Sequence, residues 1–448
     1  MLLAERAGRK LERWSNSAPR GMTVITRRLV VTESGLSVCF DLIFPAPAGS
    51  GETNRCAQGR CMSDGVLFEQ LEAADGCRIG VATLNAAKTL NALSLEMTDL
   101  LAAQLAQWAA DAGVVMVLLQ AEGDKAFCAG GDLRQLYRTM TEHHASARRD
   151  DIHGNAYAAQ FFEREYRLDY LIHTYPKPIL CWGHGIVMGG GIGLMAGASH
   201  RVATERSRLA MPEISVGLYP DVGGSWFLSR MPGKLGLFLA LTGAPLNAAD
   251  AKFVKLADYQ IAHAGKQQVV DALLQQSWRG GDAHVLLARV LRRAERAGAR
   301  HAGFAASQVR ARLDFIDELC SAPTLPEIVD ALLVAETDDP WLQKAIAALA
   351  AGAPGSAWLS HAIQQRARHL SLAQAFRLEY TVSLHCAAHT DFAEGIRALI
   401  VDKDQKPQWR PAALADIAPQ WVDRFFADPW PAGEHPLADL GAHDALRN

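Results

Sequence analysis

The stretch Gly183-His184-Gly185-Ile186-Val187-Met188-Gly189-Gly190-Gly191-Ile192-Gly193-Leu194 opens the segment, residues 183–224, around which this chain is organised. Three consecutive glycines are poor material for the interior of a strand or helix, because each loses more backbone freedom on folding than alanine does. A glycine run between a strand-like segment and an apolar helix predicts a binding turn, since its amides lie at a helix N-terminus, where negative charge is favoured. Tight packing of that helix against a neighbour is the alternative interpretation.

Composition limits the classes of function. The chain has 448 residues, 49% of them hydrophobic, so it can bury a large core. Its 45 basic and 48 acidic residues give a net charge of −3, which predicts neither a nucleic acid nor an acidic membrane surface as the main partner. No apolar run reaches the roughly 18 residues that a membrane-spanning helix needs. The eight cysteines are scattered, and Cys56 and Cys61 lack the partners of a zinc site, so we expect free thiols and no metal.

The first 61 residues differ from the rest. Basic residues and a Pro/Ala/Gly/Ser stretch without apolar periodicity predict a poorly ordered N-terminal extension. Glu5 and Glu12 weaken the case for a mitochondrial presequence, and no signal-peptide pattern is present. We therefore expect a cytoplasmic protein, or a mitochondrial-matrix protein if the source is eukaryotic. Met62 begins a segment with the pattern of folded protein and is an alternative start site.

From Val66 onward, the pattern is that of an α/β fold. Strands are expected at residues 78–84, 114–119, 178–182, 201–203 and 208–210, and a helix at residues 94–110 with Ser94 as its N-cap. The continuous apolar run at 114–119 is typical of a strand that is covered on both faces. Beyond about Gly265 the strands largely stop, and helices are expected at residues 283–299, 305–320, 325–335, 357–368 and 371–385.

A second glycine turn follows the strand at 114–119, in Ala126-Phe127-Cys128-Ala129-Gly130-Gly131-Asp132. If the amides of Gly131 and Gly190 converge, they form a two-donor pocket for a carbonyl oxygen. Such preorganised donors contribute roughly 3 to 4 kcal/mol each in a transition state.

Two carboxylates follow the glycine triplet. Glu213 comes after Met211-Pro212 in an apolar setting, and Asp221 lies eight residues later in a turn framed by proline and glycine. Taken alone, Glu213 could equally form a structural salt bridge, and Asp221 could be a turn former or a helix cap.

Several motifs in one order resemble the crotonase, or enoyl-CoA hydratase/isomerase, superfamily: Asn91-Ala92-Leu93, Ala126 to Asp132, Met188-Gly189-Gly190-Gly191 and Met211-Pro212-Glu213. Within that superfamily the chain is most similar to the 3-hydroxyisobutyryl-CoA hydrolases, through Phe161-Phe162-Glu163-Arg164-Glu165-Tyr166, Gly217 to Gly224, Gly233-Lys234-Leu235-Gly236 and Glu394-Gly395-Ile396-Arg397-Ala398. The resemblance covers about residues 66 to 415.

The resemblance implies a crotonase-like core of ββα turns over residues 62–265 and a helical C-terminal region over residues 266–448. It implies an acyl-CoA substrate whose thioester oxygen is bound by the amides of Gly131 and Gly190. Glu213 then matches the catalytic carboxylate, Asp221 the acid that holds a 3-hydroxyl group, and Glu165 a further substrate-contacting acid.

No metal or redox cofactor is implied, because coenzyme A enters as part of the substrate. Its phosphates would meet basic side chains, for which Lys88, Lys125 and Arg397 are candidates, although a solvated surface charge is the competing interpretation for each. The C-terminal helices could form a homo-oligomer, as superfamily members often do, or fold back as a lid.

One position separates the candidate reactions. The resemblance places the first glutamate of a hydratase two residues after the glycine triplet, and this chain has Gly193 there. Adding water across a double bond needs one group to take a proton and another to give it. Gly193 therefore favours thioester hydrolysis over hydration. The resemblance then implies release of free coenzyme A from a short 3-hydroxyacyl thioester, 3-hydroxyisobutyryl-CoA first, in valine breakdown. A catalytically silent acyl-CoA-binding protein is a further alternative.

Overall fold

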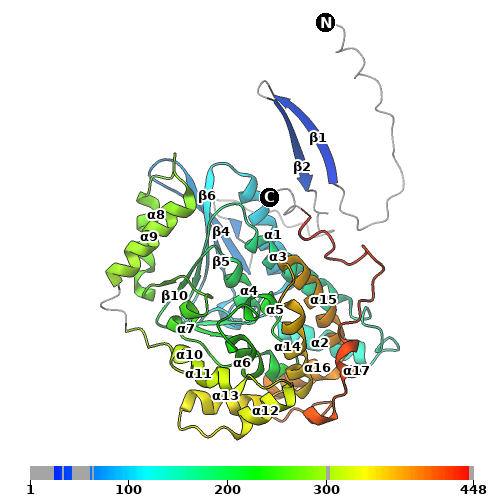
Figure 1. The fold of residues 1–448 in the computed structure, drawn as a ribbon. Coiled ribbons are helices and arrows are strands. Elements are labelled where there is room, and N and C mark those ends of the chain that lie inside the picture. The colour runs from blue at the N-terminus through cyan, green and yellow to red at the C-terminus, as the bar shows by residue number, and fades with distance from the viewer. Residues whose placement is uncertain (1–24, 33–34, 43–60, 63–64, 299–302, 443–448) are drawn as a thin grey trace, which may run out of the picture. The chain divides into compact units, whose positions relative to one another are not determined.

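The computed structural model describes residues 25–32, 35–42, 61–62, 65–298 and 303–442 (Figure 1). Residues 1–55 and 56–448 are separate compact units. In the first, β1 (Ile25–Thr32) and β2 (Gly35–Leu42) form an antiparallel hairpin, which the sequence analysis did not predict. The other expectations for the extension lie outside the described residues. The second unit contains every predicted site residue.

The second unit is built on two sheets. The larger has the order β12-β10-β8-β6-β5-β4-β3, and neighbours from β12 to β5 are parallel, whereas β4 and β3 are antiparallel additions. Its strands are β3 (Cys61–Met62), β4 (Val66–Glu72), β5 (Arg78–Leu84), β6 (Val114–Ala121), β8 (Ile179–Gly183), β10 (His200–Ala203) and β12 (Tyr259–Gln260). The smaller is parallel, with the order β11-β9-β7: β7 (Ala126–Cys128), β9 (Ile186–Met188) and β11 (Arg208–Ala210).

Successive strands go to different sheets, and a helix follows each pair. β6 and β7 lead to α2 (Leu133–His144), β8 and β9 to α4 (Gly190–Gly197), and β10 and β11 to the short η2 (Glu213–Val216). This repeat is the spiral of ββα turns that the resemblance implied. Because β7, β9 and β11 are parallel neighbours, the segments that leave their carboxyl ends come together at one edge of the small sheet.

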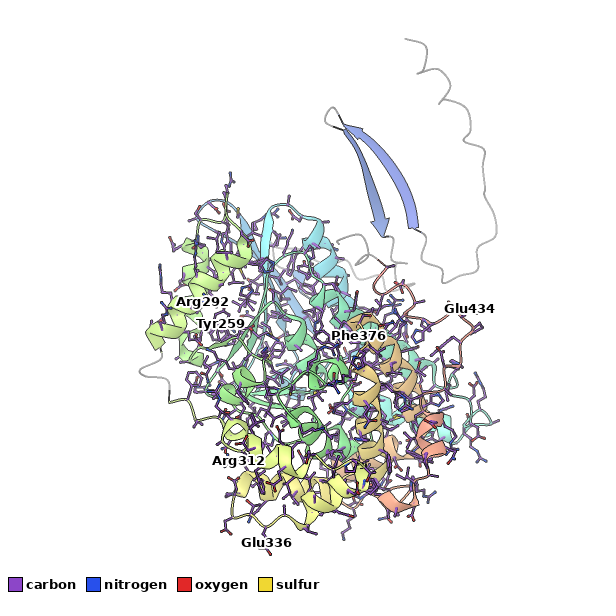
Figure 2. The ribbon with its side chains drawn as sticks, in the orientation of Figure 1. Tyr259, Arg292, Arg312, Glu336, Phe376 and Glu434 are labelled. Atoms are coloured by element: carbon purple, nitrogen blue, oxygen red, sulfur yellow. The ribbon has the colours of Figure 1, made fainter. Side chains whose placement is uncertain are left out.

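Both faces of the large sheet are buried, as the apolar run at residues 114–119 predicted. Alternate residues enter two cores: Met116 and Leu118 pack in one, and Val117 and Leu119 in the other. Two helices, α8 (Lys266–Gln275) and α9 (Ala283–Gly298), cover the first face. Arg292 of α9 and Tyr259 of β12 lie next to each other there (Figure 2).

The other face packs against α1 (Leu95–Ala110) and α3 (Ala156–His173). Ser94 caps α1 as predicted, because its Oγ accepts a hydrogen bond from the amide of Met97 at 3.1 Å. The long helix α3 was not predicted as an element, yet it carries much of the candidate site.

No strand follows Gln260 in the part of the chain that the structure describes. After α8 and α9, the α-helices there are α10 (Gln308–Ala311), α11 (Leu313–Leu319), α12 (Leu325–Val334), α13 (Pro340–Ala351), α14 (Pro354–Ala367), α15 (Leu372–Ala388), α16 (Thr390–Ile396) and α17 (Pro419–Arg424). The helix predicted at residues 305–320 is broken at Arg312, whose φ of −119° is not helical. The main core extends from Val66 to Leu437, so the ββα turns and the C-terminal helices share it.

Two further expectations concern the described residues. No helix among them combines the length and the apolar character needed to cross a membrane. The thiols of Cys77, Cys128, Cys181, Cys320 and Cys386 are free.

Candidate active site

The two glycine turns meet because β7 and β9 are paired, with Cys128 opposite Val187. A Cβ atom on Gly130 would lie 3.9 Å from the amide nitrogen of Gly190. Gly189, which joins β9 to α4, has a φ of +49°, a conformation that favours glycine. The structure therefore brings the two predicted turns to one place.

The amides of Gly131 and Gly190 are both available to a ligand. Gly190 is the first residue of α4, so its N–H has no acceptor within the helix. Gly131 forms a parallel β-bridge with Leu93. In this bridge the amide of Leu93 donates to the carbonyl of Gly130 and the amide of Asp132 donates to the carbonyl of Leu93, so the amide of Gly131 is not used. Neither N–H donates to another group of the described chain, which is the requirement for a pair of oxyanion donors.

Glu213 reaches this place from the end of β11, where it begins η2. Its Oε1 lies 3.1 Å from the position that a Cβ atom on Gly189 would take. The side chain is buried, and Oε2 has no hydrogen-bond partner among the described residues. Burial, followed by the charges of Asp221 and Glu165, raises the pKa of Glu213 well above its usual range. No basic side chain forms an ion pair with it in the described chain, so the structural salt bridge is not observed.

Asp221 is buried near enough to Glu213 for its charge to act on that residue, and it belongs to a hydrogen-bonded network. The hydroxyl of Tyr166 donates to its Oδ2 at 2.6 Å and lies 2.7 Å from the hydroxyl oxygen of Ser383. Burial raises the pKa of Asp221 to about 6, although the Tyr166 hydrogen bond acts in the opposite direction. Tyr166 thus fixes one carboxyl oxygen and leaves Oδ1 for another partner.

Glu165 faces the same place from α3. Its Oε1 stands against Gly190, so closely that a Cβ atom on Gly190 would collide with it. The side chain is 3% exposed, and burial, followed by the charge of Asp221, raises its pKa well above the usual range. The structure therefore gathers Glu165, Glu213 and Asp221 around the two glycine turns.

Glu379 on α15 is a supporting residue that the sequence analysis missed. Its carboxylate accepts hydrogen bonds from the amides of Gly223 at 2.8 Å and Ser225 at 2.9 Å, and from the Ser225 hydroxyl. Burial raises its pKa to about 8, against the effect of these hydrogen bonds. Glu379 thereby holds the turn that follows Asp221.

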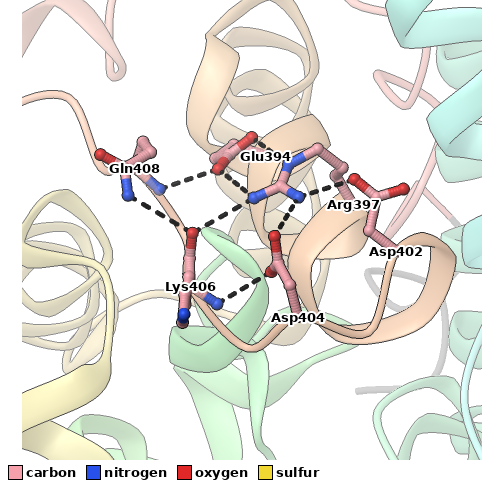
Figure 3. A network of polar contacts seen from close by, with 6 residues as sticks. All are labelled: Glu394, Arg397, Asp402, Asp404, Lys406 and Gln408. Atoms are coloured by element: carbon pink, nitrogen blue, oxygen red, sulfur yellow. Dashed lines mark hydrogen bonds and ion pairs between the residues drawn. The ribbon is translucent and has the colours of Figure 1, made fainter.

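The candidates for phosphate binding differ in availability. All five N–H donors of Arg397 are occupied, by Glu394, Asp402, Asp404 and the carbonyl of Lys406 (Figure 3). Arg397 is therefore a structural centre of the C-terminal region and is not available to a phosphate. Lys88 and Lys125 are exposed, and neither forms an ion pair in the described chain.

A metal centre is not evident at this place. Across residues 65–298 and 303–442, no three His, Cys, Asp or Glu side chains are close enough together to hold an ion. What the site offers is two free amides, a buried carboxylate without a partner and two further acids. That set can polarise a carbonyl group and activate or replace a water molecule.

Fold and site together define an enzyme of the crotonase fold, in which ββα turns bring glycine amides and acids to one edge of a small sheet. Residues 79–426 match the profile of a family described as enoyl-CoA hydratase/isomerase, and the chain belongs to this family.

Several relatives of the chain have names that state a more specific activity than the family description does. The chain is 37% identical over 363 residues to "3-hydroxyisobutyryl-CoA hydrolase, mitochondrial" of Danio rerio, covering 81% of this chain and 89% of the relative. It is 33% identical over 360 residues to the protein of that name in Homo sapiens, covering 80% and 88%. It is 35% identical over 354 residues to "3-hydroxyisobutyryl-CoA hydrolase 1" of Arabidopsis thaliana, covering 78% and 89%.

Two solved structures are also similar. A carnitinyl-CoA dehydratase from Mycobacterium thermoresistibile has a TM-score of 0.69 at 35% identity and covers 82% of this chain and 98% of its own. An enoyl-CoA hydratase from Rhodobacter sphaeroides 2.4.1 has a TM-score of 0.67 at 31% identity and covers 83% and 99%. The titles of these structures name reactions other than thioester hydrolysis.

Proposed function

We propose that this protein hydrolyses the thioester of a short 3-hydroxyacyl-CoA, with 3-hydroxyisobutyryl-CoA as the preferred substrate, in valine breakdown. The observation that carries the proposal is the buried Glu213, whose Oε2 has no partner and whose Oε1 lies next to the turn that begins with Gly189. The names of the relatives in Danio rerio, Homo sapiens and Arabidopsis thaliana support the choice of substrate.

In the proposed reaction the thioester oxygen accepts hydrogen bonds from the amides of Gly131 and Gly190, which stabilise the negative charge that develops on it. Glu213 either takes a proton from the attacking water or attacks the carbonyl carbon to give a mixed anhydride, which water then opens. The carbon–sulfur bond breaks in both cases, and coenzyme A leaves as the free thiol after protonation of its sulfur.

The two other acids recognise the acyl group. The 3-hydroxyl donates a hydrogen bond to Asp221, through the Oδ1 that Tyr166 does not use. Glu165, next to Gly190, contacts the substrate close to the thioester. This assignment explains why three buried acids are kept together despite their mutual repulsion, a cost that active sites tolerate more often than structural cores do.

Hydration of an enoyl thioester is the competing function, and the titles of the two similar solved structures favour it. Gly193 argues against hydration, because it supplies no second acid at the position where a hydratase carries its first glutamate. A silent acyl-CoA-binding protein would have no use for the unpartnered Glu213.

A screen of short acyl-CoA thioesters, with the free thiol read by a colorimetric reagent, tests the proposal. We expect thiol release from 3-hydroxyisobutyryl-CoA and, more slowly, from 3-hydroxypropionyl-CoA. Absence of thiol release from every 3-hydroxyacyl ester would contradict it. The oligomeric state and the cytoplasmic or mitochondrial location stay predictions, which sizing of the purified protein and cell fractionation would test.

A further inference from the structure

Three titratable side chains of α3 lie one helical turn apart, and each meets a glycine of α4. Glu165 stands against Gly190, as described above. A Cβ atom on Gly193 would lie 2.7 Å from Oδ2 of Asp169. The same pattern continues one turn further on, where a Cβ atom on Gly197 would lie 2.9 Å from Cδ2 of His173. The glycine face of α4 therefore makes room for this row.

Asp169 is the member of the row that the fold does not explain. Its side chain is fully buried, at 0% exposure, and neither carboxyl oxygen accepts a hydrogen bond from a donor among the described residues. A buried polar group without a partner destabilises the fold, and more so when it is charged. No ion pair with a basic side chain of the described chain offsets that cost.

The groups that face Asp169 do not favour its ionisation. Glu165 lies on the same helix, Asp221 in the turn next to α4, and Glu379 on α15, and all three are acids. The face of α4 itself is glycine. Burial, followed by the charge of Glu165, raises the pKa of Asp169 well above its usual range.

The fourth neighbour, His173, adds no positive charge. Its Nε2 is buried without a partner, and burial lowers its pKa to about 4, so it is neutral at neutral pH. Phe376 of α15, labelled in Figure 2, packs edge-on against the rings of Tyr170 and His173 and helps to cover this part of α3. Asp169 thus has acids and a neutral imidazole around it, and no positive charge, one turn away from Glu165.

We propose that Asp169 is a positioning residue that keeps its proton at neutral pH and offers it as a hydrogen bond to Glu165, which fixes the Glu165 carboxylate against Gly190. Residues four apart on a helix are neighbours on one face, which makes Glu165 the acceptor in this proposal. An O–H donor facing an ionised carboxylate is among the stronger hydrogen bonds in proteins. The pair then holds one negative charge and one proton.

The proposal also accounts for Gly193. The space that a side chain at this position would enter is filled by the Asp169 carboxyl and by Val222, whose Cβ would lie 2.8 Å away. This space can therefore hold an acid from α3 or an acid at position 193, but not both, and in this chain it holds the acid from α3.

Two substitutions distinguish the loss of the hydrogen-bond donor at position 169 from the loss of its ability to ionise. Asp169→Asn keeps a donor but cannot ionise, whereas Asp169→Leu has the same branched shape and neither property. At neutral pH we expect Asp169→Asn to keep kcat/KM within about threefold of the wild type, and Asp169→Leu to lose at least about tenfold. Glu163→Gln, at a partly buried position of the same helix outside this row, where Glu163 pairs with Arg167, is the control, with wild-type turnover expected.

The pH profile gives a readout that a merely structural role would not move. In the wild type, loss of the Asp169 proton at alkaline pH puts a second negative charge beside Glu165 and lowers kcat/KM. Asp169→Asn should move this alkaline limb upward by at least about one pH unit, since the coupled pair no longer exists. Wild-type activity in Asp169→Leu, or an unchanged alkaline limb in Asp169→Asn, would overturn the proposal.

The kinetic measurement rests on the proposed hydrolysis, so the second measurement is one that needs no turnover. Infrared difference spectra of the substrate-free protein at neutral pH should contain a protonated-carboxyl band that is lost in both Asp169 variants and kept in Glu163→Gln. An unchanged band in both variants would refute the inference. If the wild type hydrolyses no thioester but the band is lost in the variants, the proposed function fails and the protonated Asp169 stands.

Discussion

Replacing Asp221 by asparagine should make the protein more stable at alkaline pH while impairing its recognition of 3-hydroxyacyl groups. Asp221 is 5% exposed, and burial raises the pKa of its carboxyl from 3.8 to about 6. The unfolded chain therefore ionises at lower pH than the folded one. The stability contributed by this group is fully present below about pH 4 and is lost as the pH rises through about 6. A shift of roughly 2 pKa units corresponds to about 3 kcal/mol.

Between pH 5 and pH 8 the wild type should lose about 1.4 kcal/mol of this contribution, because only the last pH unit below its folded pKa falls within that interval. Asp221→Asn has no such loss, and removal of the charge also relieves Glu213 and Glu165, which acts in the same direction. The side-chain oxygen of asparagine can still accept the hydrogen bond from Tyr166.

Urea unfolding of both proteins at the two pH values measures the difference. We expect the stability of Asp221→Asn, relative to wild type, to improve by about 1.4 kcal/mol or more from pH 5 to pH 8. In turnover, the variant should lose about 10- to 100-fold for 3-hydroxyacyl esters and less for the same chains without the hydroxyl. A constant stability difference across the two pH values, or equal losses on both substrate classes, would refute the reasoning.

Further predictions follow from single contacts. Gly193→Ala places a methyl group 2.7 Å from Oδ2 of Asp169 and should cost about 1 to 3 kcal/mol in urea unfolding; full stability would show that the α3–α4 contact adjusts freely. Arg397→Ala leaves Glu394 and its acidic neighbours facing each other, so the melting temperature should fall while KM for acyl-CoA is unchanged; a raised KM would restore Arg397 as a phosphate ligand. A chain that starts at Met62 should fold and keep full turnover, and loss of solubility would show that the preceding residues belong to the domain.

Five of the strands and the two glycine turns were accessible from sequence because their signals are local. An apolar run without polar alternation marks a strand that is buried on both faces, and β6 fits that description. A glycine at position 189 indicates a backbone with positive φ, and the structure has a φ of +49° there. Glu213 and Asp221 became candidates because one follows a strand and the other lies in a turn framed by proline and glycine, and because both match the family resemblance; their roles stay predictions.

The groups that support these acids could not be found in the same way. Glu379 is separated from Gly223 by 156 positions, and nothing near Glu379 in the sequence points to a distant turn. Tyr166 ends the motif at residues 161–166, but its hydrogen bond to Asp221 depends on how α3 packs against the ββα turns. Asp169 had a weak signal, the spacing of four residues from Glu165, which becomes visible only once α3 is recognised as a helix.

The break of the predicted helix at residues 305–320 coincides with a tertiary contact that periodicity does not reveal. Arg312 ends α10 and begins α11, and its guanidinium forms an ion pair with Asp339, the N-cap of α13. Its carboxylate partner comes from a later helix, and apolar spacing carries no information about such a contact. Patterns of apolar residues locate elements better than they locate their ends.

The central claim is tested most directly by one side-by-side assay of the wild type and Glu213→Gln, with 3-hydroxyisobutyryl-CoA and crotonyl-CoA as substrates. Thiol release and loss of the enoyl absorbance are followed on the same preparation. The account predicts thiol release from the 3-hydroxyacyl ester, a decrease of at least roughly a hundredfold in Glu213→Gln, and no appreciable loss of the enoyl absorbance. Loss of the enoyl absorbance without thiol release, or near-normal hydrolysis by Glu213→Gln, would contradict it.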